Sequence, residues 1–228
     1  MLVVRHSVVG PFASNGYLAA CSETGEAILI DPGGEVPRLA ALREPGGFRV
    51  TRLFCTHGHI DHVAGGAEAV RVFEAPLQIH AADRDWVEAL ADQAAMFGFE
   101  GVETPVPIAH FHEDGETFLV GRQPARVIHT PGHTRGSCSL FFPEAKLVFT
   151  GDTLFVGSVG RTDLAGGDFG EIERSIRQRL FTLGDEVAFH PGHGPSGVIG
   201  QERMSNPFVG EGRAQPGVPL RITSKPRP

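Results

Sequence analysis

The sequence predicts a layered α/β fold, and three observations support this prediction. Its 228 residues fit one domain, or one domain with a tail. Short runs rich in Val, Ile and Leu, typical of strands, alternate with stretches whose apolar residues follow helical spacing. Several strand-like runs end directly in polar motifs, which is where active sites on layered α/β scaffolds are built.

The chain begins with three strand-like runs followed by a helix. Residues 2–9, 15–21 and 26–31 are separated by Gly-Pro and Thr-Gly turn signals, which predicts an antiparallel meander. A turn starting at Asp31 then leads into residues 35–43, whose apolar positions predict a helix. Asp31 is either an ordinary turn residue or a partner that orients a metal-ligating histidine.

A fourth strand, residues 49–55, leads into the stretch around which the chain is organised. Residues 56–62 hold four potential metal ligands, which are His57, His59, Asp61 and His62. Without a bound ion these groups would suffer mutual repulsion and desolvation, so packing alone explains them poorly. In an extended loop the first two point the same way, because side chains alternate with a period of two. The last two come where a helix over residues 63–73 begins, so we expect a site for two metals.

The middle of the chain is expected to form a short strand at residues 77–79 and a helix from residue 81 to about 96. This helix ends in Phe97-Gly98-Phe99, which is either the wall of a substrate channel or ordinary packing. Residues 105–115 contain prolines and are expected to form a loop. The two histidines of this loop, His110 and His112, resemble the metal motif only superficially.

Strands return in the second half, so the two halves share one architectural scheme without a detectable sequence repeat. The expected strands are residues 117–120, 125–128, 139–142, 147–150 and 187–190, with helices at residues 169–183 and 200–206. After residue 207 the chain is rich in Gly and Pro. We therefore expect a domain over residues 1–208 and a loose tail over residues 209–228.

A closed pair of metals needs more nitrogen and oxygen donors than residues 56–62 supply. His133, Asp152 and His193 are the candidates, because each follows a strand-like run and would lie on a loop at a strand's end. The complete set of five imidazoles and two carboxylates contains no thiolate and suits Zn, Fe or Mn. The expected cofactors are therefore two divalent metal ions, whose identity the ligand set leaves open.

Composition excludes several classes of protein. The net charge of −7 argues against a nucleic-acid partner, which would favour a basic face. The three cysteines are far apart and lie in apolar or small-residue segments, which is typical of core residues rather than disulfides. No run approaches the ~18 apolar residues of a membrane span, and no secretory leader is recognisable. A soluble cytoplasmic protein is expected, with no membrane partner and an oligomeric state that the sequence leaves open.

Five motifs in order resemble the metallo-β-lactamase-fold hydrolases, and within them the glyoxalase II (hydroxyacylglutathione hydrolase) group. They are Thr-His-Gly-His-Ile-Asp-His (56–62), Pro-Gly-His-Thr (131–134), Gly-Asp-Thr-Leu-Phe (151–155), Gly-Arg-Thr-Asp (160–163) and Pro-Gly-His-Gly (191–194). The resemblance spans roughly residues 3–208 and implies a four-layered αββα sandwich with the metals at one edge of the sheets. It also implies a first metal on His57, His59 and His133, a second on Asp61, His62 and His193, and Asp152 bridging both.

Details of the sequence distinguish it from some relatives. True metallo-β-lactamases tend to carry Cys where Asp152 stands, and flavodiiron oxidoreductases carry Glu in place of His59. Asp152 and His59 are therefore expected to exclude both classes. Full-length glyoxalase II enzymes continue into a C-terminal helical domain that supplies much of the glutathione-binding site, whereas 35 residues follow His193 here. The chain is similar to the shorter bacterial form.

Arg161 stands where many members have Lys, so it either holds a substrate carboxylate by a forked contact or pairs with Asp163.

The ligand set predicts hydrolysis by a hydroxide held between the metals, because metal binding lowers the pKa of water to about 7. The hydroxide would attack a thioester carbonyl, with Asp61 and Asp152 as catalytic residues. A thiolate leaves with a conjugate pKa near ~8.5, so no strong general acid is needed. The preferred substrate is hydroxyacylglutathione (S-lactoylglutathione). The alternatives are a glutathione persulfide dioxygenase with a single iron, a lactone or other ester hydrolase, and a metal-binding module without catalysis.

Overall fold

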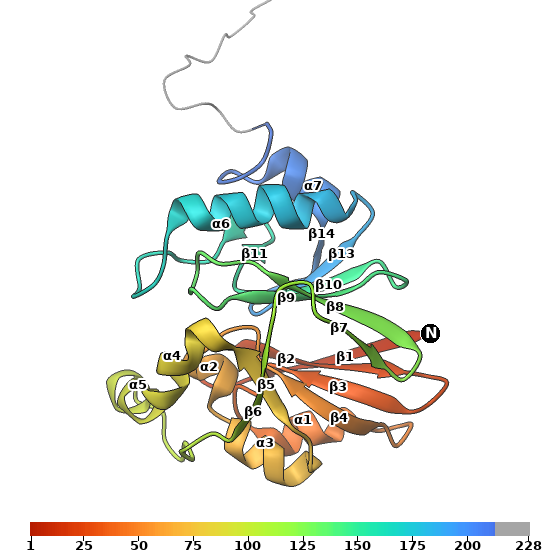
Figure 1. Cartoon of the computed structure of the whole chain (residues 1–228), viewed down its shortest axis with the longest axis vertical. Helices are drawn as coiled ribbons and strands as arrows, with labels where there is room; N and C mark the ends of the chain where they lie inside the picture. The colour runs from red at the N-terminus through yellow and green to blue at the C-terminus, as the bar shows by residue number, and fades with distance from the viewer. Residues whose placement is uncertain (213–228) are drawn as a thin grey trace, which may run out of the picture.

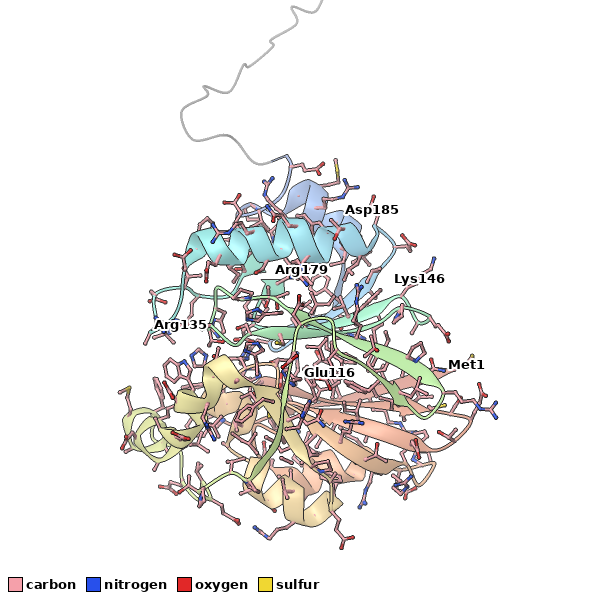
Figure 2. All side chains as sticks on the ribbon, viewed as in Figure 1. Met1, Glu116, Arg135, Lys146, Arg179 and Asp185 are labelled. Carbon is pink, nitrogen blue, oxygen red and sulfur yellow. The ribbon has the colours of Figure 1, made fainter. Side chains whose placement is uncertain are left out.

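Two β-sheets pack face to face and carry helices on their outer faces (Figure 1). The computed structural model describes residues 1–212 of the chain. Side chains fill the space between the four layers (Figure 2). The αββα sandwich that the motifs imply is therefore the architecture of this protein.

The first sheet has six strands in sequence order: β1 Leu2–Val9, β2 Ser14–Cys21, β3 Glu26–Ile30, β4 Arg49–Phe54, β5 Leu77–His80 and β6 Ile108–His112. The first three strands form the predicted antiparallel meander. Each of the next three pairs in parallel with its neighbour, which requires crossover connections. Those connections carry helices onto one face of the sheet.

The second sheet has the order β14-β13-β10-β9-β8-β7. Its strands are β7 Thr117–Val120, β8 Gln123–His129, β9 Cys138–Phe142, β10 Leu147–Gly151, β13 Ala188–Pro191 and β14 Gly197–Val198. A small hairpin of β11 Leu154–Phe155 and β12 Ser158–Val159 follows β10. β8 and β10 both run antiparallel to β9, whereas β13 runs parallel to β10. β8, β10 and β13 therefore point the same way and end at one edge of the sheet.

The helices are short and belong to two outer layers (Figure 1). The first layer holds α1 Val36–Ala41, α2 Ile60–Val63, α3 Gly66–Phe73, η1 Ala81–Asp83, α4 Arg84–Glu88 and α5 Leu90–Phe97. The second holds α6 Phe169–Ser175, η2 Ile176–Leu180, η3 Phe181–Leu183 and α7 Ile199–Ser205. Ile172, Ile176 and Leu180 recur every four residues and are fully buried against the second sheet. This apolar stripe is why residues 169–183 form a continuous helical layer.

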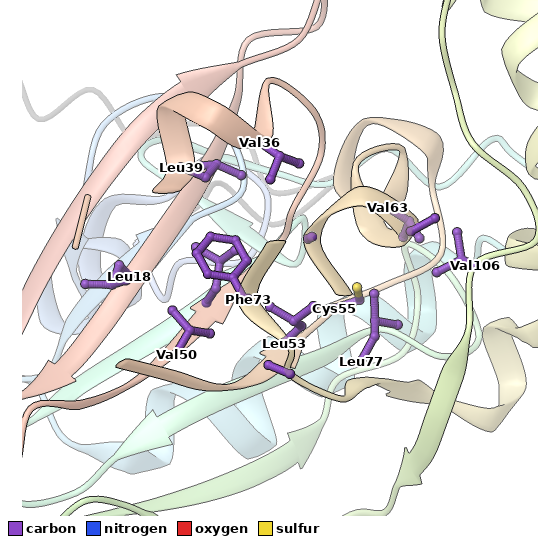
Figure 3. Close-up of a cluster of buried hydrophobic side chains, with 14 of the residues drawn as sticks. Leu18, Val36, Leu39, Val50, Leu53, Cys55, Val63, Phe73, Leu77 and Val106 are labelled. Carbon is purple, nitrogen blue, oxygen red and sulfur yellow. The ribbon is translucent and has the colours of Figure 1, made fainter. Parts of the chain in front are cut away.

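The core has three parts because each sheet buries both faces. Successive residues of one strand point to opposite faces of the sheet. Leu18 and Ala19 on β2 accordingly belong to different clusters. One cluster lies between the first sheet and its helices and includes Leu39, Leu53 and Phe73 (Figure 3). A second fills the space between the sheets, and a third lies under α6 and α7. The three cysteines are free and buried, as expected.

Two expectations from the sequence need correction. Residues 105–115 are not a plain loop, because β6 lies within them and pairs in parallel with β5. The packed domain also continues past residue 208, since Val209 is fully buried and Glu211 donates a backbone hydrogen bond to Arg203. The rest of the predicted tail lies outside the described residues. None of the helices described for residues 1–212 is long and apolar enough to span a membrane.

Candidate metal centre

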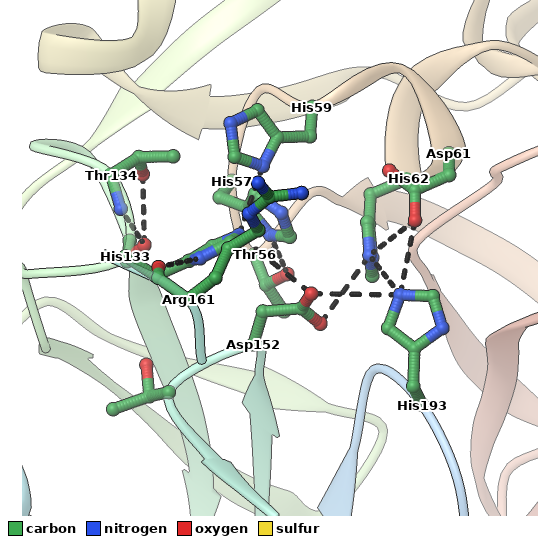
Figure 4. Close-up of polar contacts among 12 residues, drawn as sticks. Thr56, His57, His59, Asp61, His62, His133, Thr134, Asp152, Arg161 and His193 are labelled. Atoms are coloured by element: carbon green, nitrogen blue, oxygen red, sulfur yellow. Dashed lines mark hydrogen bonds and ion pairs between the residues drawn. The ribbon is translucent and has the colours of Figure 1, made fainter. Parts of the chain in front are cut away.

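All seven predicted ligands follow the ends of strands and meet at one edge of the sandwich (Figure 4). Five lie on loops, and Asp61 and His62 lie in the short helix α2. Residues 55–62 follow β4 in the first sheet, whereas the other three ligands follow β8, β10 and β13 in the second. The common direction of these three strands brings His133, Asp152 and His193 to the same edge. The site is therefore shared between the two halves of the fold.

The donor atoms of the seven residues form overlapping groups, and within each group they lie within 4.8 Å of one another. The groups are His57 with His59 and His133, Asp61 with His62 and His193, and His57 with His62 and Asp152. Asp152 lies between the first two groups. Its carboxylate oxygens are 3.4 Å from Nε2 of His62, 3.5 Å from that of His193 and 3.7 Å from that of His133.

Asp31 orients the first ligand loop. Its carboxylate accepts hydrogen bonds from the backbone N–H of Thr56 at 2.7 Å and from the Thr56 hydroxyl at 2.8 Å. The same carboxylate lies 3.0 Å from Nδ1 of His62. A hydrogen bond there places the proton on Nδ1 and leaves Nε2 of His62 free to bind a metal. Of the two roles open to Asp31, orienting a ligand is the one that this contact supports.

Two other histidines present one nitrogen to the cluster in the same way. Nδ1 of His133 donates to the carbonyl of Arg161 at 2.8 Å, and Nδ1 of His57 lies 3.0 Å from the hydroxyl of Thr56. Within residues 1–212, the buried atoms His57 Nε2, His59 Nε2 and Asp152 Oδ1 have no hydrogen-bond partner. Buried polar atoms without partners are costly unless something binds them. The donor set therefore fits divalent metal ions.

The electrostatics of the cluster also suit a metal. Burial lowers the pKa of His57, and that of His59 to about 3, so both imidazoles are neutral at pH 7, which is the form that binds a metal. Burial alone would raise the pKa of Asp61, but His62 and His193 outweigh it and lower that pKa. Asp61 is therefore ionised at neutral pH, as a carboxylate ligand must be.

Asp83 was missed by the sequence prediction, although it holds two ligand loops together. It is fully buried and accepts hydrogen bonds from the Gly58 N–H at 2.9 Å, the Thr134 hydroxyl at 2.7 Å and the Gly136 N–H at 2.7 Å. Gly58 lies between His57 and His59, and Thr134 follows His133. A single aspartate at the start of a helix carries no spacing signal, so only the fold reveals this role.

The loop that carries His193 is anchored to β2. The side-chain amide of Asn15 donates to the carbonyls of Pro191 and Gly194, both at 3.0 Å. The Tyr17 hydroxyl donates to the same Pro191 carbonyl at 2.7 Å. These contacts join the first sheet to the last ligand loop. They fix the position of His193 relative to the ligands of residues 57–62.

A cavity of about 710 Å³ opens onto the cluster. Five of the seven predicted ligands line it, and much of the remaining wall is apolar: Phe12, Ile60, Trp86, Ala89, Met96, Phe97, Leu164 and Ala165. The rings of Phe97 and Phe99 both contact Phe12 edge-on, with centroids 5.7 and 5.3 Å apart. Met96 and Phe97 are therefore part of the cavity wall, whereas Phe99 packs against the core on the helix side of the first sheet.

Arg161 lines the cavity, but its guanidinium is already paired. Its Nε and Nη2 donate to the two carboxylate oxygens of Asp163 at 2.7 and 2.9 Å, with both side chains largely exposed. Both roles expected for Arg161 are thus compatible with its position. A guanidinium has five N–H groups, and Asp163 occupies two of them.

The histidines of residues 110–112 lie away from the cluster. His110 pairs with Glu116, and the ring of His112 stacks on Phe54 with centroids 4.4 Å apart. The groups of potential ligands found within residues 1–212 contain neither histidine. Within residues 1–212 the potential ligands that lie together are thus the seven residues named above.

Comparisons with known proteins agree with this architecture. The family model described as the metallo-beta-lactamase superfamily matches residues 9–193. The hydroxyacylglutathione hydrolase GloC of Haemophilus influenzae is 37% identical over 184 residues, which are 80% of this chain and 87% of GloC. The crystal structure of TTHA1623 in a di-iron-bound form has a TM-score of 0.78 and 36% identity, covering 90% of this chain and 99% of that one.

A further structural neighbour bears on the comparison with β-lactamases. The BLEG-1 B3 metallo-beta-lactamase has a TM-score of 0.83 and 31% identity, covering 91% of this chain and 99% of its own. Similarity to a protein with that description weakens the expectation that Asp152 separates this chain from β-lactamases. Hydrolysis of a β-lactam therefore belongs among the activities to be tested.

Proposed function

The chain belongs to the metallo-β-lactamase superfamily, and from this premise we propose that it is a metal-dependent hydrolase of thioesters acting on hydroxyacylglutathione (S-lactoylglutathione). The observation that carries the proposal is the opening of a largely apolar cavity onto a set of nitrogen and carboxylate donors suited to two metal ions. The similarity to GloC supports the choice of a thioester. Zn, Fe and Mn all suit the donors, and TTHA1623 shows that iron is accepted by a similar protein.

The seven residues divide into two sets of terminal ligands and one shared carboxylate in this proposal. His57, His59 and His133 would hold the first ion, and Asp61, His62 and His193 the second, because these sets correspond to two of the donor groups. Asp152 would bind both ions, since it lies between the sets. Divalent ions bound there would lower the pKa of water and polarise a carbonyl oxygen, which is the chemistry that ester and thioester hydrolysis requires.

The protein's own groups would position the reacting molecules. Asp61 would accept a hydrogen bond from the attacking water, because its carboxylate lies at the cavity wall and is ionised at pH 7. Arg161 would contact the substrate through the N–H groups that Asp163 leaves unused. The departing thiolate has a conjugate pKa near ~8.5, so it leaves without a strong general acid.

Metal analysis of the purified protein, combined with an assay of S-lactoylglutathione hydrolysis, tests the proposal. We expect two metal ions per chain and turnover that is lost on chelation and restored by Zn, Fe or Mn. A β-lactam assayed in parallel should react much more slowly than the thioester. A fully metallated protein without thioesterase activity would overturn the proposal.

A persulfide dioxygenase is the second candidate, because residues 160–163 read Gly-Arg-Thr-Asp, the segment that resembles those enzymes. Dioxygenases of this fold use a single iron, so metal content separates the two functions. Oxygen uptake in the presence of glutathione persulfide, with one iron per chain and no thioester hydrolysis, would favour this alternative.

A further inference from the structure

A second cavity of about 340 Å³ adjoins the one at the metal cluster. It is lined by Ala82, Asp85, Trp86, Arg135, Ala165 and Gly166. Trp86 and Ala165 line both cavities, and the Trp86 ring contacts the predicted ligand His59 with centroids 4.6 Å apart. A molecule whose reacting end lies at the cluster can therefore extend past Trp86 into the second cavity.

The backbone that carries Arg135 is held firmly. Its carbonyl accepts a hydrogen bond from Nε2 of His129 at 2.8 Å. The residues before and after it, Thr134 and Gly136, both donate to the carboxylate of Asp83. The side chain of Arg135 lies beside Gly166. A β carbon added at Gly166 would lie 3.4 Å from Cγ of Arg135. The backbone of Arg135 is thus held in place before any ligand binds, which reduces the part of the binding entropy that ordering this loop would cost.

The charge of Arg135 is available to a ligand, unlike that of Arg161. Among the residues that the structure describes, the Arg135 guanidinium forms no ion pair, whereas Arg161 is bonded to both carboxylate oxygens of Asp163. Asp85 lines the same small cavity, yet the two opposite charges do not pair with each other. Figure 2 shows Arg135 at the side of the molecule where the two halves of the sandwich face each other. An unpaired cation and an unpaired anion therefore line one cavity next to the reaction site.

We propose that this second cavity binds the charged end of the substrate's thiol portion, with Arg135 as the anchor for a carboxylate and Asp85 as the partner of an ammonium group. The planar fork of a guanidinium matches the two oxygens of a carboxylate, and Trp86 shields one side of the contact from water. The chemical class is an amino-acid or short-peptide thiol that carries both charges, joined to the acyl group as a thioester. The inference rests on the proposed thioesterase function and extends it to the thiol portion.

Kinetics with two substrates test the subsite. In Arg135→Ala, KM for S-lactoylglutathione should rise about tenfold with kcat within about twofold, because a charged hydrogen bond shared by ground and transition states is lost. KM for the lactoyl thioester of N-acetylcysteamine, which carries no charge, should stay unchanged. Arg135→Lys should fall between wild type and Arg135→Ala. The matched control is Arg126→Ala, which removes the same charge from an exposed position on β8 that lines neither cavity.

The role of Asp85 has its own comparison. Asp85→Asn should raise KM for S-lactoylglutathione, because the variant loses the ion pair with the substrate's ammonium group. KM for the same thioester with its amino group acetylated should stay unchanged, because that molecule has no ammonium group for Asp85 to bind. Equal increases of KM for the charged and uncharged carriers in Arg135→Ala, or an equal effect of Arg126→Ala, would overturn the subsite.

Binding of an unreactive probe separates failure of the subsite from failure of the thioesterase proposal. S-Methylglutathione carries the same charges and contains no thioester. Calorimetry with the metal-loaded protein should show binding that weakens about tenfold in Arg135→Ala and is unchanged in Arg126→Ala. This result would support the subsite even if no thioester were hydrolysed. Absence of binding to the wild type, or equal binding to both variants, would overturn it.

Discussion

The carboxylate of Asp83 accepts a 2.7 Å hydrogen bond from the hydroxyl of Thr134, which joins a helix of the first layer to a ligand loop of the second sheet. The same carboxylate accepts from the backbone of Gly58 and Gly136. One buried side chain thus fixes the distance between the loops of His57, His59 and His133. Its removal should disturb the fold and the cluster together.

Asp83→Ala should lower the free energy of unfolding by about 3 kcal/mol or more, because it leaves buried donors without an acceptor. Asp83→Asn keeps the volume and one acceptor oxygen, so it should lose less. Urea unfolding and metal content measure the two effects. The control is Asp85→Ala, an exposed position on α4 that should unfold like wild type. A stable Asp83→Ala with full metal content would show that the loops hold their positions without this contact.

Asp152→Ala should reduce metal content and activity more than His193→Ala does. The reason is that both ions lose a donor and the charge between them, so their mutual repulsion is no longer offset. Metal analysis after dialysis and the rate of thioester hydrolysis measure the change. Two tightly held ions and wild-type turnover in Asp152→Ala would refute the bridging role.

Gly192→Ala should damage the cluster without changing any ligand. A β carbon at position 192 would lie 2.2 Å from Oδ1 of Asp152 and 2.6 Å from Cε1 of His62, so one of them must move. We expect weaker metal binding, measured by competition with a chelator. Gly194→Ala is the comparison, since a β carbon there meets nothing within 4 Å, although its φ of +72° adds local strain. Equal metal affinity in Gly192→Ala and wild type would show that the loop can shift.

Arg161→Ala should raise KM for S-lactoylglutathione with less effect on kcat, as expected when a contact shared by ground and transition states is lost. Metal content should stay unchanged, because His133 is bonded to the backbone carbonyl of residue 161 and not to its side chain. A fall in kcat with constant KM would instead indicate that Arg161 positions the loop through Asp163.

His112 should make the protein less stable as the pH falls. Burial, assisted by the charges of nearby histidines, lowers its pKa in the folded state to about 3, whereas the unfolded value is near ~6.5. Between these values only the unfolded chain takes up the proton, so this residue removes about 1.4 kcal/mol of stability for each pH unit of acidification. Above pH 6.5 its contribution is constant.

His112→Phe keeps an aromatic ring stacked on Phe54 and removes the proton uptake. The difference in unfolding free energy between variant and wild type should therefore grow in favour of the variant from pH 6.5 down to pH 4. Parallel pH profiles for the two proteins would contradict the assignment.

The sequence predicted the parts of the fold and of the candidate site that are formed by residues close together in the chain. The ligands of residues 57–62 were recognisable because they crowd into one loop, and the others because each follows an apolar strand. β6 was missed because Pro105 and Pro107, just before it, indicate a loop, whereas the strand is stabilised by pairing with β5, some thirty residues earlier in the chain. Asp83 and Arg135 are single residues without a pattern, so their roles follow only from the fold. Pairing between Arg161 and Asp163 was foreseen, because the two residues are close in sequence.

The anchoring of the His193 loop on β2 has a consequence for the order in which the site is made during translation. His62 and His193 are 131 residues apart, and Asn15 is 176 residues from the Pro191 carbonyl that it binds. Ribosomes add about 5–20 residues per second, so the first sheet emerges many seconds before the loop that completes the cluster. A nascent chain thus exposes three histidines and an aspartate on one loop before their partners exist. If the seven residues bind metal as proposed, full affinity would require the last strand to dock, and metal capture would follow the synthesis of most of the domain.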